Sequence, residues 1–218
     1  MRALRILPIL IPVLIALTFT NTAFAKSVTM TYEGHQGATA IDGSPYIGYP
    51  YYFSINGSTT YTPLLCDSYD NNVSLGQTFT ATATPFLQGI SGSMFGSSMA
   101  MDYRAAGLIF KSMLNGSLDR AQAQWAIWGL FSTNAQGNSF FTTIGGASID
   151  ATYLALAQSA PNSSFNGLVL YTPLGAKPGS GPQEFIGYSA VPEPTTLTLL
   201  GTGLIGLASV ARRKLSKA

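Results

Sequence analysis

Apolar and polar residues alternate along the segment from Lys26 to Pro85, and this alternation predicts β structure. The alternating or aromatic-rich segments are Val28 to Tyr32, Tyr46 to Ile55, Tyr61 to Cys66 and Thr78 to Thr84. Asn56-Gly57 is a typical hairpin turn between two such segments. In the last segment a period of two places Thr78, Thr80, Thr82 and Thr84 on one strand face.

The pattern becomes helical after a Gly- and Ser-rich stretch, Phe86 to Met99, which predicts a loop. Ala100 to Leu114 carries apolar residues at helical spacing and is ended by Asn115-Gly116. Ser117 is the predicted N-cap of a second helix that runs to about Phe131. One stripe of that helix holds Ala121, Gln124, Trp125 and Trp128.

The remaining chain predicts one more helix and two closing strands. The helix is Ser148 to Ala160, and the strands are Phe165 to Tyr171 and Glu184 to Ser189, joined by a Gly/Pro linker from Leu174 to Pro182. We therefore expect an α+β fold, with β-sandwich or barrel-like strands and an inserted helical hairpin.

The N-terminal segment, residues 1–25, has the pattern of a signal peptide. Arg2 and Arg5 precede an apolar stretch, Ile6 to Phe19, that is short for a membrane span. Ala23 and Ala25 form a small-x-small cleavage site, so the mature chain is expected to begin at Lys26. An uncleaved N-terminal anchor is the alternative.

The C-terminal segment, residues 191–218, combines three features in a fixed order. A Pro-Glu-Pro motif comes first, then the uncharged stretch Thr195 to Ala211, then a basic cluster that favours the cytoplasmic side. The motif residues are Val191, Pro192, Glu193 and Pro194, and the basic residues are Arg212, Arg213 and Lys214. The uncharged stretch predicts one single-pass transmembrane helix.

This C-terminal pattern resembles the PEP-CTERM sorting signal of Gram-negative bacteria. The resemblance implies recognition by an exosortase-type membrane protease, cleavage near the Pro-Glu-Pro motif, and delivery from the inner membrane to the envelope surface or extracellular matrix. A plain C-terminal membrane anchor is the alternative interpretation.

The charge of the predicted exported domain, residues 26–190, excludes some functions. Although the whole chain has a net charge of +2, this domain has five basic against eight acidic residues. It lacks the basic face of a nucleic-acid binder. With one histidine, His35, and one cysteine, Cys66, the sequence predicts no metal site, cofactor or internal disulfide. All eleven Tyr and both Trp lie in this domain, which favours a folded core.

Cys66 ends a predicted strand, and Gln124, Ala126, Ile127 and Trp128 lie on a helix further along the chain. This pair of segments resembles the thioester domains of bacterial surface adhesins, in which a strand Cys and a helix Gln join through their side chains. The resemblance implies a covalent bond between Cys66 and Gln124, with Trp125 and Trp128 excluding water around it. A buried structural Cys beside an ordinary core helix is the alternative.

These observations predict an exported, surface-sorted protein that attaches covalently to amine-bearing partners, and not an enzyme. The other hypothesis is a non-covalent carbohydrate- or matrix-binding module that uses its Tyr- and Thr-rich strands. An envelope hydrolase is the weakest alternative, because the sequence offers no convincing acid/base set.

Overall fold

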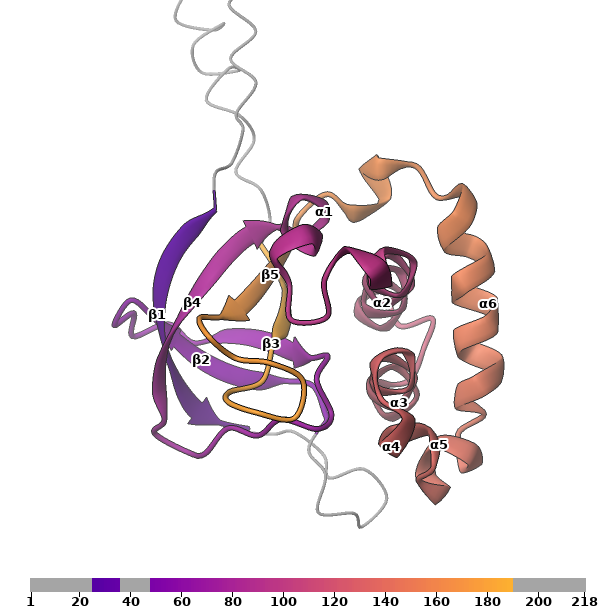
Figure 1. The fold of residues 1–218 in the computed structure, drawn as a ribbon, viewed down its shortest axis with the longest axis horizontal. Helices are drawn as coiled ribbons and strands as arrows, with labels where there is room; N and C mark the ends of the chain where they lie inside the picture. Colours follow the sequence, from indigo (N-terminus) through magenta and orange to yellow (C-terminus); the bar gives the residue numbers. More distant parts are fainter. Residues whose placement is uncertain (1–24, 36–47, 190–218) are drawn as a thin grey trace, which may run out of the picture.

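The computed structural model describes residues 25–35 and 48–189. Its six strands form one closed antiparallel barrel in the order β1-β2-β3-β6-β5-β4 (Figure 1). The strands are β1 Lys26–Gly34, β2 Tyr51–Ile55, β3 Thr62–Cys66, β4 Thr78–Pro85, β5 Leu168–Pro173 and β6 Phe185–Tyr188. The six expected strands are confirmed, although β2 begins at Tyr51 rather than Tyr46 and β5 begins at Leu168 rather than Phe165. Of the two expected arrangements the structure has the barrel, because each strand has two partners.

Alternate residues of these strands supply two hydrophobic clusters. One cluster includes Met30, Phe53, Leu64 and Phe185, whose side chains share the inner face of the barrel. The outer face contributes other residues, among them Leu65, to a second cluster shared with the helices. A period of two therefore serves two cores, because the barrel wall is covered on its helical side.

The helices form two further layers beside the barrel, with α2 and α3 next to it and α6 outermost (Figure 1). The longer helices are α2 Ala100–Leu114, α3 Arg120–Phe131 and α6 Gly146–Ser159. The shorter ones are α1 Phe86–Gly89, α4 Thr133–Gln136 and α5 Ser139–Thr143, with 3-10 turns at Ile90–Gly92, Ser97–Met99 and Asn162–Phe165. The expected helical hairpin is α2 and α3.

Two local expectations are wrong. The predicted loop from Phe86 to Met99 contains α1 and two 3-10 turns, because Phe86 and Ile90 are buried in the helical cluster. The N-cap of α3 is Asp119 and not Ser117, since the Asp119 carboxylate accepts hydrogen bonds from the amides of Ala121 and Gln122.

Trp125 and Trp128 are 0% and 2% exposed, which confirms that α3 packs its aromatic residues into the fold. Because α3 lies between the barrel and α6, it is buried on nearly every side. The predicted signal peptide, sorting motif and transmembrane helix lie outside the described residues. Within the described ranges, no helix is long and apolar enough to cross a membrane.

Candidate functional site

Cys66 is the last residue of β3, and its side chain belongs to the cluster inside the barrel. It is fully buried and forms no disulfide. Its thiol donates to the main-chain oxygen of Ser68 over 3.6 Å. Cys66 therefore lies at the end of β3 that α3 contacts.

Gln124 of α3 reaches this same strand end. Its side-chain Nε2 donates to the main-chain oxygen of Cys66 over 2.6 Å, and Gln124 is fully buried. Its Oε1 accepts no hydrogen bond from the described part of the chain. An unsatisfied buried amide oxygen costs about 1–3 kcal/mol, so this side chain has a structural cost that ordinary core packing does not explain.

The sulfur of Cys66 lies beside one further donor from α3. The indole Nε1 of Trp128 donates to Cys66 Sγ over 3.5 Å. Burial raises the pKa of the thiol to about 12, and an ionised Asp67 would be the second cause of this increase, whereas hydrogen bonds with Trp128 and Ser68 act in the opposite direction. Cys66 is therefore a protonated thiol at neutral pH.

Aromatic rings surround this thiol. The ring centroids of Trp125 and Trp128 are 5.1 Å apart, and Tyr69 lies 5.7 Å and 5.3 Å from them. Phe140 of α5 stacks on Trp125 at 5.8 Å. Tyr69 and Phe140 are only partly buried, whereas Trp125 and Trp128 are buried.

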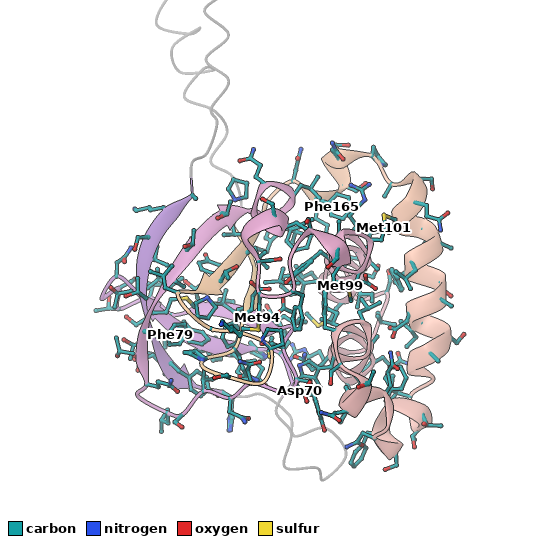
Figure 2. The ribbon with its side chains drawn as sticks, viewed as in Figure 1. Asp70, Phe79, Met94, Met99, Met101 and Phe165 are labelled. Carbon is teal, nitrogen blue, oxygen red and sulfur yellow. The ribbon has the colours of Figure 1, made fainter. Side chains whose placement is uncertain are left out.

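The segment after Cys66 is rich in polar residues, but it is partly buried. Asp67, Ser68 and Asn71 are inaccessible to solvent, whereas Asp70 is exposed. Asp70, labelled in Figure 2, accepts a hydrogen bond from Asn134 of α4 over 2.8 Å and so ties this segment to the helices. The sequence does not reveal this burial, because the residues that hydrogen-bond to the segment lie more than sixty positions away in the chain.

Asp67 lies beside a second buried carboxyl group, Glu184, which the sequence reasoning missed. Glu184 accepts hydrogen bonds from the hydroxyls of Tyr103 and Thr172 and from the main-chain amide of Met94 at 2.9 Å. An acidic residue that directly precedes an apolar strand was the only available signal.

The described residues contain no group of three or more metal-ligating side chains, and His35 is exposed. The structure brings together Cys66, Gln124, Trp125 and Trp128 as one site. The signal-cleavage residues Ala23 and Ala25 are not both described, and the sorting motif from Val191 to Lys214 lies outside the described ranges.

Residues 190–214 match the family described as the PEP-CTERM protein-sorting motif. The chain thus carries a signal recognised by exosortase, a membrane protease, on exported proteins that pass through the membrane to the cell surface. No curated protein and no solved structure matches the chain.

Proposed function

We propose that residues 26–190 form a surface-sorted attachment domain that joins amine-bearing partners through an internal thioester between Cys66 and Gln124. The observation that carries the proposal is the 2.6 Å contact between Gln124 Nε2 and the Cys66 carbonyl, with both residues fully buried. Their positions differ by 58 residues, so only the packing of α3 over β3 brings them together.

The proposed bond forms with all atoms accounted for. Cys66 Sγ attacks the side-chain carbonyl carbon of Gln124, the C–N bond breaks, and the thiol proton leaves with the amide nitrogen as ammonia. Because the thiol pKa is about 12, the step depends on enforced contact rather than on a standing thiolate. A thioester oxygen is also a poorer acceptor than an amide oxygen, which lowers the cost of the unsatisfied Oε1.

The proposed partner is a primary amine on the cell surface or in the matrix. The amine attacks the Gln124-derived carbonyl, forms an amide bond and releases the Cys66 thiol. Trp125 and Trp128 are almost fully buried and keep water from the bond until then. The bond is used once per chain, so the protein is proposed as an attachment factor and not as an enzyme.

The test is the intact mass of the purified exported chain, with both termini determined by peptide mapping. We expect the mass to fall short of the sequence mass by one ammonia. Cys66→Ala and Gln124→Ala should each abolish the deficit, and methylamine should abolish it while exposing one thiol. Gln122→Ala, two residues earlier on α3, is the matched control and should retain it.

A native mass equal to the sequence mass, with a thiol that alkylates after unfolding, would exclude the thioester. The non-covalent surface module then takes its place. The observation favouring that second function is the threonine face, on which Thr29 pairs with Thr80 and Thr31 with Thr78 across β1 and β4. The hydroxyls of Thr31 and Thr78 are 2.9 Å apart at the surface, a regular polar row suited to a polysaccharide.

A further inference from the structure

Asp67 and Glu184 lie side by side on the face of the barrel wall opposite to Cys66. Adjacent side chains of a strand point to opposite faces, so Asp67 points away from the Cys66 sulfur. Cys66 pairs with Phe185, and the same register places Asp67 opposite Glu184. The Asp67 amide donates to the Glu184 main-chain oxygen over 3.2 Å, and both side chains are fully buried.

The two carboxyl groups have very different hydrogen-bonding partners. Glu184 accepts from Tyr103, Thr172 and the Met94 amide, and these donors stabilise a negative charge. Neither oxygen of Asp67 accepts a hydrogen bond from the described residues. Two fully buried, adjacent carboxyl groups resist ionising together, because each negative charge disfavours the other, so one of them keeps a proton.

We propose that Asp67 and Glu184 share one proton, held on Asp67, and that neutral Asp67 is a positioning residue for the thioester at Cys66. Protonated Asp67 donates a hydrogen bond to the Glu184 carboxylate. This side-chain bond reinforces the β3–β6 pairing at the residue after Cys66. The proton also leaves Glu184 as the one charged member of the pair, so that Asp67 places no negative charge near the sulfur. The effect on the thioester rests on the function proposed above, whereas the shared proton does not.

The electrostatics of the surroundings support this distribution. Burial, followed by the charge of Glu184, raises the pKa of Asp67 well above its usual range. Burial also raises the pKa of Glu184, but its hydroxyl and amide donors oppose that increase. The titratable groups that face the pair are Tyr103 from α2 and Cys66 from β3. The pKa of Tyr103 is raised too, so its phenol remains a donor.

Loss of the shared proton has a consequence at Cys66. The charge on Asp67 is the second cause, after burial, that raises the pKa of the thiol. An ionised pair would also repel across the strand ladder that positions the Cys66 carbonyl. This repulsion would displace the Cys66 carbonyl that accepts from Gln124, so thioester formation should decline as alkaline pH removes the shared proton. In the Asp67→Asn variant the side chain at position 67 is uncharged at every pH, so this variant should not show the decline.

Infrared difference spectroscopy on the exported chain tests the proton directly. We expect a carbonyl band of a protonated carboxyl group at neutral pH that disappears in Asp67→Asn. In Glu184→Gln the band should change position, because an amide replaces the carboxylate that accepts the proton. Asp150→Asn, which alters another buried carboxyl group, should retain the Asp67 band. The absence of any Asp67-dependent band in the natural chain would overturn the proposal.

Refolding over a pH series tests the link to Cys66. The fraction of chains that lose ammonia should fall several-fold toward alkaline pH in the natural chain and in Asp150→Asn, but stay level in Asp67→Asn. Glutamate in place of Gln124 counts as a formed and hydrolysed bond only above the level that Cys66→Ala shows under the same conditions. Equal pH profiles for folded natural chain and Asp67→Asn would overturn the positioning role.

The two readouts separate this proposal from the thioester itself. An Asp67-dependent band in a chain that never loses ammonia supports the shared proton and overturns the thioester. Loss of ammonia in a chain without such a band supports the thioester and overturns the shared proton.

Discussion

The indole Nε1 of Trp128 donates a hydrogen bond to the sulfur of Cys66 over 3.5 Å, which links α3 to the end of β3. The same helix reaches the Cys66 carbonyl through Gln124. Residues at i and i+4 share one face of a helix. This spacing lets Gln124 and Trp128 donate to the carbonyl oxygen and the sulfur of Cys66, respectively.

Replacement of Trp128 separates its hydrogen bond from its packing. Trp128→Phe keeps a ring but removes the N–H, so we expect a loss of about 1 kcal/mol and slower loss of ammonia on refolding. Trp128→Ala also leaves a cavity and should cost about 3–5 kcal/mol in urea unfolding. Leu174→Ala, at a 61% exposed position, is the control. Equal ammonia-loss rates in natural chain and Trp128→Phe would argue against a role for the indole N–H.

At Gly129, α3 packs tightly against Phe141 of α5 and Asp150 of α6. A Cβ at this position would lie 2.2 Å from Cε2 of Phe141 and 2.8 Å from Oδ2 of Asp150. Gly129→Ala should therefore destabilise the fold by about 1–3 kcal/mol, measured by thermal or urea unfolding. At Gly137 the nearest atom would be 3.5 Å away, and Gly137→Ala should be nearly neutral. Equal stability of the two variants would contradict this packing.

Asp150 should make the stability of the protein depend on pH. Burial first, and the charge of Asp102 second, raise its pKa from the ordinary value of 3.8 to about 7. The folded state thus prefers the protonated carboxyl group. The stability it contributes is complete below about pH 4 and is lost as pH rises through about 7.

Asp150→Asn removes this pH dependence. The variant should gain stability relative to the natural chain as pH rises from about 4 to about 7, and urea unfolding at several pH values measures the gain. Asp70→Asn removes the same charge at an exposed position and controls for the change in net charge. A stability difference that stays constant over this range would rule out titration of Asp150.

The C-terminal sorting segment should be dispensable for folding. Deletion of Thr195 to Ala218 removes most of the matched motif and none of the described strands or helices. We expect a folded domain released into the periplasm or medium, detected by fractionation and by its protected Trp fluorescence. An insoluble or unfolded product would show that the tail contributes to the domain.

Local sequence patterns determined the longer helices, the strands and the sorting signal of this protein. The bounds of α2 were predicted at Ala100 and Leu114, because apolar spacing and the following Asn115-Gly116 act within one or two turns. The sorting signal is likewise a short linear motif, and the comparison confirms it at residues 190–214. The helix bounds and the sorting motif can both be recognised in a single sequence, because neither depends on residues far away along the chain.

Only the tertiary structure decided how distant segments meet. Closure of the barrel depends on β1 pairing with both β2 and β4, which no local pattern specifies. The α4 and α5 helices are too short to produce a helical period of their own. Cys66 and Gln124 were matched by resemblance, but their contact exists because α3 lies over the end of β3.

The pairing of Asp67 with Glu184 is the clearest such case. In the sequence, Asp67 begins a polar run and Glu184 begins a predicted strand after a Gly/Pro linker, so nothing local pairs the two residues. The β3–β6 register places them opposite each other, and α2 then covers them with Tyr103. Burial and proximity are properties of the fold, and they give two ordinary carboxyl groups a shared chemistry that their own sequence positions do not contain.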